Sequence, residues 1–125
     1  MDSSCKGIIL KTSYDKMGSV GNIEILGKTM LEWVSLSLCD MPFVCIDNND
    51  ELALPELIRD YLDMQKEYTV VLYSDTPLIT RKTVGEAVET ARLNNLNVMR
   101  MTRGFVFKTD YIATAEKIYT DKTYY

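Results

Sequence analysis

Short continuous apolar runs recur along the chain and predict its strands. A strand covered on both faces of a sheet is apolar throughout, unlike the alternating pattern of a half-exposed strand. Such runs lie at residues 7–10, 43–46, 69–73, 98–101 and 105–107, with a further short strand expected at 23–26. The run at 69–73 is the clearest, because it is rich in β-branched and aromatic residues.

Amphipathic segments separate these runs and predict helices. Helices are expected from Thr29 to about residue 40, from Pro55 to residue 65, from Thr80 or Thr83 to Asn94, and from Thr109 to about residue 118. Strands that alternate with helices favour right-handed βαβ units. We therefore expect an α/β fold of three layers, with a mostly parallel sheet and helices on both faces.

Length and composition set bounds on the class of protein. The 125 residues suit one domain, 1–125, with one core, and 46% hydrophobic and 26% charged residues are ordinary globular usage. No apolar run approaches the length of a membrane span, and the first residues lack a secretory signal, so a cytoplasmic protein without a membrane partner is expected. The net charge of −4 argues against a nucleic-acid partner. Three scattered cysteines and no histidine support neither a disulfide framework nor a zinc site.

Candidate chemistry lies where open α/β sheets bind ligands, beyond the carboxyl ends of their strands. Two segments qualify: the loop after Leu10 and the turn after Tyr73. The turn holds Asp75, a lone carboxylate directly beyond the clearest strand. Such a carboxylate either holds Mg²⁺ against substrate phosphates or caps the turn, and spacing alone favours the cap.

Two other motifs are weak. Gly27, Lys28 and Thr29 end like the phosphate-binding pattern G-x-x-x-x-G-K-S/T, but Gly21 lies one residue too far upstream. The acidic stretch 47–51 begins like a calcium loop, but it lacks the required glycine and the bidentate carboxylate. A solvated turn is the better interpretation of that stretch.

The segment from Tyr73 to Ile79 resembles a motif of nucleotidyltransferases that make sugar nucleotides, G-D-x-P-L-I/L, with Ser74 in place of the glycine. Residues 7–10 are similar to the first strand of that family, residues 27–34 to its G-K-P-M-L-E-x-V helix start, and residues 104–107 to its late G-x-x-x-F strand. The branch of N-acetylglucosamine-1-phosphate uridyltransferases is the most similar. The resemblance implies a shortened, Rossmann-like nucleotidyltransferase fold.

The resemblance also implies site residues. Asp75 matches the family's magnesium ligand, and Lys28 matches the lysine before the second helix. The family's phosphate-binding loop, L-A-A-G-x-G-T/S-R-M, corresponds to residues 10–17, of which Leu10, Lys11, Thr12 and Lys16 are the nucleotide-binding candidates. Both glycines and the arginine of that loop are absent here, a later family lysine falls near Val20, and no second magnesium ligand matches around residues 101–103.

Nucleotidyl transfer depends on positioning and on neutralising negative charge as it develops. A chain that keeps one metal ligand without the phosphate loop should therefore catalyse poorly. The expected function is a degenerate nucleotidyltransferase-like domain that serves as a nucleotide-binding, regulatory or assembly module. The expected ligand is a nucleoside triphosphate or sugar nucleotide, and the expected cofactor is Mg²⁺. The alternatives are an active enzyme completed by homo-oligomerisation and a non-catalytic interaction domain.

Overall fold

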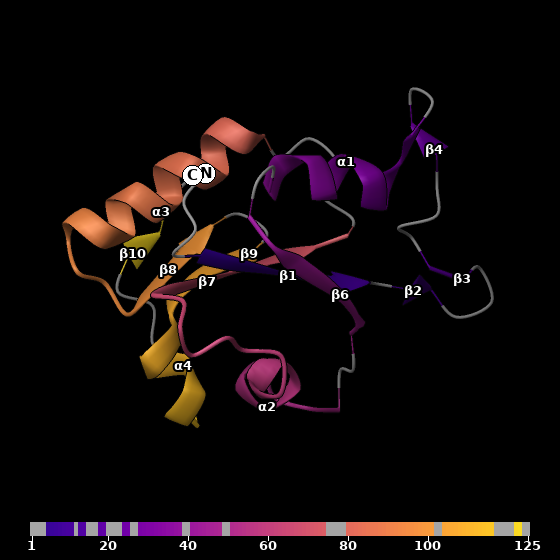
Figure 1. Ribbon diagram of the computed structural model, residues 1–125. Helices are drawn as coiled ribbons and strands as arrows, with labels where there is room; N and C mark the ends of the chain where they lie inside the picture. Colours follow the sequence, from indigo (N-terminus) through magenta and orange to yellow (C-terminus); the bar gives the residue numbers. More distant parts are fainter. Residues whose placement is uncertain are drawn as a thin grey trace.

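The computed structural model describes residues 5–11, 13–14, 18–19, 24–25, 28–38, 41–48, 51–74, 80–101, 104–116 and 122–123. A six-stranded sheet, with the strand order β10-β8-β9-β7-β1-β6, runs through the centre of the molecule (Figure 1). Its strands are β1 (Cys5–Lys11), β6 (Phe43–Asp47), β7 (Tyr68–Tyr73), β8 (Val98–Met101), β9 (Gly104–Lys108) and β10 (Lys122–Thr123). Each of the five apolar runs at 7–10, 43–46, 69–73, 98–101 and 105–107 thus forms a strand, as predicted.

The sheet is mostly parallel. Strands β6 and β7 both lie parallel to β1, with Ile8 opposite Val44 on one side and Val71 on the other. Strand β9 runs antiparallel to both of its neighbours, β7 and β8, and β10 is parallel to β8. Only β9 is therefore reversed among these six strands, because a hairpin and not a helix joins it to β8.

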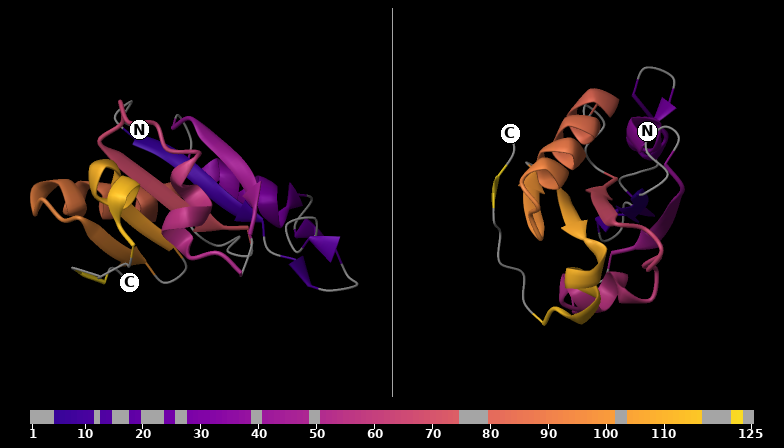
Figure 2. Two further views of the ribbon diagram at one scale, coloured as in Figure 1. Left: turned by 90° about the horizontal axis from the view of Figure 1, so that it is seen from below. Right: turned by 60° about the vertical axis from the view of Figure 1, so that its left-hand side comes forward.

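Helices cover both faces of the sheet. Helices α1 (Met30–Leu38) and α3 (Arg81–Leu93) lie on one face, and α2 (Leu54–Arg59) and α4 (Thr109–Thr114) lie on the other (Figures 1 and 2). Because successive strand side chains point to opposite faces, Ile9 packs with the first pair of helices, whereas Ile8 and Leu10 pack with the second. The three-layer α/β architecture is confirmed.

Helix α3 shows how the sequence fixes an element's start. Its N-cap is Thr80, whose hydroxyl oxygen accepts a hydrogen bond of 3.2 Å from the backbone N–H of Thr83. The structure thus decides between the two threonines that were candidates for the cap. Its buried stripe is formed by the small and branched residues Val84, Ala87, Val88 and Ala91.

Two helices are shorter than predicted. Helix α2 ends at Arg59 and not at residue 65, because the N–H groups of Tyr61 and Leu62 bond three residues back and the Asp63 side chain accepts from the N–H of Gln65. Helix α4 ends at Thr114, where Ala115 adopts an extended conformation. In both segments apolar spacing continues past the helix, since Leu62 and Ala115 still pack against the core.

Four short strands form two hairpins outside the main sheet: β2 (Ser13–Tyr14) with β3 (Gly18–Ser19), and β4 (Glu24–Ile25) with β5 (Lys28–Thr29). The short strand expected at 23–26 is present as β4. Lys28 and Thr29, the two described residues of the phosphate-loop-like motif, pair with this strand, and Gly27 lies outside the described residues. None of the described helices has the length and apolar character needed to cross a membrane.

One strand prediction is wrong in its burial. The run at 43–46 predicts a strand covered on both faces, but β6 is the terminal strand of the sheet and only Ile46 within it is buried. Phe43 is 43% exposed. An apolar run does not distinguish a central strand from an edge strand whose faces are partly covered.

Candidate functional site

The carboxyl ends of β1, β6 and β7 meet at one edge of the sheet. Lys11 lies opposite Asp47, and Leu10 lies opposite Tyr73. Beyond the ladder, the N–H of Ser74 donates to the Leu10 carbonyl at 2.9 Å, so the chain leaving β7 starts beside the end of β1. The two segments that the sequence singled out, after Leu10 and after Tyr73, therefore begin side by side.

Leu10 and Ser74 support this edge from inside the core. Both residues are fully buried, and the Leu10 side chain packs in the cluster beneath α2 and α4. The Leu10 side chain is thus turned away from solvent, and its contribution to the edge is a backbone carbonyl that holds the start of the next segment. Ser74 stands where the resembling family has glycine.

Lys11 places a positive charge at this edge. Its Nζ lies 3.4 Å from Oδ1 of Asp47, across the register pair that ends β1 and β6. The Lys11 side chain is 34% exposed and that of Asp47 is 89% exposed, so water screens the ion pair. A phosphate that approached Lys11 would have to compete with this carboxylate.

The remaining site candidates are placed only in part. Lys28 lies in β5, where its backbone pairs with Ile25. Thr12, Lys16 and Asp75 lie outside the described residues. Within the described ranges there is no group of three or more His, Cys, Asp or Glu side chains that could hold a metal ion.

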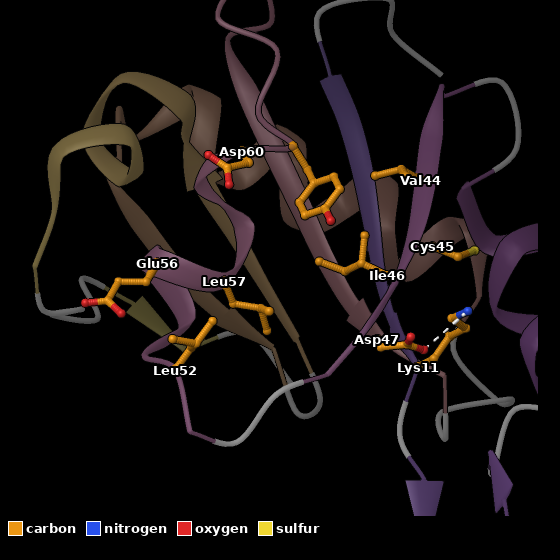
Figure 3. A pocket seen from close by; sticks show the side chains of 10 residues that line it. Lys11, Val44, Cys45, Ile46, Asp47, Leu52, Glu56, Leu57 and Asp60 are labelled. Carbon is orange, nitrogen blue, oxygen red and sulfur yellow. Dashed lines mark ion pairs between the residues drawn. The ribbon is translucent and has the colours of Figure 1, made fainter.

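A pocket of about 460 Å³ lies between β6 and α2 and extends to the Lys11–Asp47 pair (Figure 3). Apolar side chains from the strand and from the segment 52–61 form much of its wall, and carboxylates lie among them. The lining residues include Val44, Ile46, Leu52, Leu57 and Tyr61, with the acids Asp47, Glu56 and Asp60. Sequence reasoning missed this pocket, because it extended the helix that begins at Pro55 to residue 65 and so past the segment that lines the pocket.

Cys45 also lines this pocket. Partial burial raises the pKa of the Cys45 thiol, and the nearby positive charge of Lys11 opposes that shift without cancelling it. The protonated thiol is therefore the dominant form at neutral pH, which makes it a weak nucleophile.

No family model matches the chain. A curated relative, an FMN-dependent NADH:quinone oxidoreductase from Mycoplasmopsis pulmonis, is 26% identical over 117 residues, which are 94% of this chain and 56% of that protein. The chain thus spans little more than half the length of that relative. The oxidoreductase activity in its name is a property of that protein.

Three solved structures share the arrangement of elements. Rv0371c from Mycobacterium tuberculosis has a TM-score of 0.65 at 12% identity, and the match covers 97% of this chain and 79% of the Rv0371c chain. Rv0371c has also been solved in complex with manganese. The synthetase of CMP-2-keto-3-deoxy-manno-octonic acid, complexed with CTP, has a TM-score of 0.58 at 15% identity. The match covers 78% of this chain and 51% of the synthetase chain. A hypothetical transferase from Thermus thermophilus has a TM-score of 0.56 at 15% identity, and the match covers 84% of this chain and 66% of the transferase chain.

These likenesses define the class of fold. The order of strands, the reversed β9 and the helices on both faces form a nucleotidyltransferase-like α/β fold of the Rossmann type. The fold implied by the sequence resemblance is therefore confirmed. Fold and function are separable, so the activity has to be argued from the site.

Proposed function

We propose that this chain is a degenerate nucleotidyltransferase-like domain that binds a nucleoside triphosphate or sugar nucleotide with Mg²⁺ and turns it over poorly. The nucleotide would lie at the carboxyl ends of β1, β6 and β7, where open α/β sheets bind ligands. The observation that carries the proposal is the Lys11–Asp47 pair at 3.4 Å, which places a cation at this edge but shares its charge with a carboxylate.

Binding is supported by the meeting of two segments. The Ser74–Leu10 hydrogen bond starts the segment that contains Asp75 beside the segment that contains Lys11. Mg²⁺ commonly uses one or two carboxylates together with substrate phosphates, so a single aspartate is a sufficient protein ligand. Two structures of similar fold were solved with CTP and with manganese, which is consistent with such a ligand.

Poor turnover is supported by the missing positive charge. Nucleotidyl transfer requires the developing phosphate charge to be neutralised in the transition state. The loop from residue 10 to residue 17 lacks the arginine and the glycines of active family members, and Lys11 is engaged by Asp47. Such a site can hold a nucleotide more easily than it can stabilise a transition state.

Titration calorimetry with UTP and CTP, each with and without Mg²⁺, tests the proposal on the wild-type chain and three variants. Asp75→Ala should remove Mg²⁺-dependent binding. Lys11→Met should weaken binding by about two- to fivefold, and Asp47→Asn should strengthen it by a similar factor, because an exposed charge pair is worth up to about 1 kcal/mol. A general loss of structure would weaken nucleotide binding in both variants, so changes of affinity in opposite directions would point to the ion pair itself.

Lys108→Met is the control for Lys11→Met. Lys108 lies opposite Tyr68, at the end of β7 that is far from the carboxyl edge, and its Nζ donates a hydrogen bond of 2.7 Å to Oδ1 of Asn95. It should leave nucleotide affinity unchanged. Absence of nucleotide binding in both the wild-type chain and Asp47→Asn would overturn the proposal.

Two further readouts separate the alternatives. A pyrophosphate-release assay that shows turnover, lost in Asp75→Ala, would instead indicate an active enzyme, and light scattering would show whether a homo-oligomer completes its site. Tighter binding of UTP than of CTP would favour the uridyltransferase branch. FMN is a useful competing probe, since flavin binding without Mg²⁺-dependent triphosphate binding would contradict the proposed site.

A further inference from the structure

Strand β6 offers one free edge. Its inner edge pairs with β1, where the Gly7 N–H donates to the Pro42 carbonyl at 2.8 Å and the Asn48 N–H donates to the Lys11 carbonyl at 3.1 Å. In a parallel ladder alternate residues direct their backbone groups at the partner strand. The backbone N–H and C=O groups of Phe43, Cys45 and Asp47 therefore point outward, and no other strand of the described sheet pairs with them.

Exposed apolar side chains lie beside this free edge on both faces of the sheet, with Phe43 on the α1 face and Leu52 and Tyr61 on the α2 face. Six large apolar side chains are exposed in the described part of the chain, and three of them are Phe43 in β6 (43%), Leu52 (43%) and Tyr61 (40%). Leu52 and Tyr61 line the pocket that lies against β6. A single exposed apolar side chain is ordinary, but several beside an unpaired strand edge mark a contact surface.

The charge around the edge is negative. Asp47, Glu56 and Asp60 line the pocket, and in Figure 3 the carboxylates of Glu56 and Asp60 point away from β6. Neither of these two acids forms an ion pair with another described residue, and both residues are exposed.

Three cationic side chains lie nearby, and each of them has a partner. Lys11 pairs with Asp47, the Lys6 Nζ donates to the Tyr61 carbonyl at 2.6 Å, and the Arg59 guanidinium donates to the Ala115 carbonyl at 2.9 Å. The carboxylates of Glu56 and Asp60 therefore remain available to a positively charged ligand.

We propose that the free edge of β6 and the adjoining pocket bind an extended, basic segment of another protein as an added strand. Outward N–H and C=O groups supply the main-chain hydrogen bonds of such a complex, and pockets beside the edge select alternate side chains. This proposal rests on the edge and the pocket, and it does not require nucleotide binding.

The chemistry of the occupant follows from the two kinds of group beside the edge. Alternate side chains of an added strand would face the α2 side. Lysine or arginine there would lay its methylene stem on Leu52 and Leu57 and extend its charged head to Glu56 or Asp60. A second copy of this chain is disfavoured, because symmetric pairing through β6 would bring the same carboxylates from both copies together.

The probe is a displayed library of random peptides about twelve residues long, selected on the full chain. We expect selected sequences in which lysine or arginine alternates with aliphatic residues. Their affinity should fall about tenfold or more in Cys45→Pro, because proline removes the outward N–H donor at the centre of β6 and leaves the β1 ladder intact. The double variant Glu56→Gln/Asp60→Asn should weaken binding by about two- to fivefold and should reduce its salt dependence.

The double variant Glu86→Gln/Glu89→Gln is the matched control. It also removes two negative charges, but from α3 on the other face of the sheet, and it should leave peptide affinity unchanged. If Cys45→Pro fails to fold, amide hydrogen exchange on the wild-type chain provides the same test. Added peptide should slow exchange at Phe43, Cys45 and Asp47, whose N–H groups point outward.

Several results would overturn the proposal. They are a library that yields no binders, binders without enrichment in basic residues, and affinities that change equally in the test and control variants. Light scattering that shows a dimer in the wild-type chain and a monomer in Cys45→Pro would assign the edge to a second copy instead. Loss of nucleotide binding alone would leave the proposal standing, so the two proposals fail separately.

Discussion

Strands β6 and β7 pair with the same strand in the same direction, yet they differ in the burial of their side chains and in the pairing of their second edge. Both lie parallel to β1, and Ile8 pairs with Val44 on one side and Val71 on the other. Every residue from Tyr68 to Leu72 is buried, whereas Ile46 is the one buried residue of β6. The difference arises because β9 covers the other edge of β7, while β6 ends the sheet.

This comparison indicates a division of roles. A central strand gains stability from two ladders and from packing on both faces, and its residues tolerate little change. A terminal strand keeps unpaired backbone groups and partly exposed side chains, which are costly as aggregation risks but useful for recognition. Substitutions in the two strands should therefore separate stability from binding.

The largest expected effect is in β7. Leu72→Ala should lower the free energy of unfolding by about 2–5 kcal/mol, because Leu72 is fully buried and its removal leaves a cavity. Phe43→Ala in β6 should cost about 1 kcal/mol, since much of that side chain is already in water. Urea unfolding of both variants measures the difference, and equal losses would contradict the division of roles.

A second effect tests the strand beside β7. Gly104 in β9 has φ of +151°, and a Cβ at this position would lie 2.5 Å from the Val71 carbonyl oxygen, which the sheet holds in place. Gly104→Ala should therefore cost about 1–3 kcal/mol or more. Gly85→Ala within α3 is the control and should stabilise the chain by up to about 1 kcal/mol. A loss of the same size in both variants would show that the backbone of Gly104 is not the cause.

The sequence predicts much of this fold because apolar runs and their polar boundaries are local features. The predicted run at 69–73 became β7 with one added residue, and Thr80 caps α3 as one of two candidates. The exposure of β6 was not predicted, since nothing in four apolar residues says whether another strand lies beside them. The early end of α2 was missed because Tyr61 and Leu62 keep helical spacing while they line the pocket and the core.

The candidate site was predictable where it follows from topology. Strands that run parallel end at one edge, so the meeting of the segments after Leu10 and Tyr73 could be expected. The ion pair between Lys11 and Asp47 could not, because 36 positions separate them and only the register of β1 against β6 brings them together. The relation of Asp47 to Glu56 and Asp60 depends on how the segment 52–61 lies against β6, which the sequence pattern does not show.

A third effect concerns the pH dependence of β7. Burial raises the pKa of the Tyr68 phenol, Glu67 raises it further, and Arg92 opposes the shift. A folded-state pKa above the unfolded value of 10.0 means that this contribution to stability is present below pH 10 and is lost as pH rises through the folded-state pKa. The wild-type chain should therefore lose part of its stability above pH 10 through this group.

Tyr68→Phe isolates that contribution. The phenol donates a hydrogen bond of 3.3 Å to the Ala91 carbonyl, which also accepts from the N–H of Leu96, so its loss at pH 7 should cost only about 0.5–1 kcal/mol. The difference between wild type and variant should shrink above pH 10, as measured by urea unfolding across that range. A difference that stays constant would show that the Tyr68 pKa is not raised in the folded chain.

The smallest expected effect on stability is at the end of β6, in the ion pair between Lys11 and Asp47. This pair gives the sharpest test of whether β6 serves binding and β7 serves stability. A double-mutant cycle of Lys11→Met and Asp47→Asn should give a coupling energy below about 1 kcal/mol that falls with salt, because Asp47 is 89% exposed. The same two substitutions should shift nucleotide affinity in opposite directions, because each removes one side of a competition for the Lys11 charge. A pair that contributes little to folding but sets affinity acts in binding; a coupling of several kcal/mol without an effect on affinity would instead make it a structural link between the two strands.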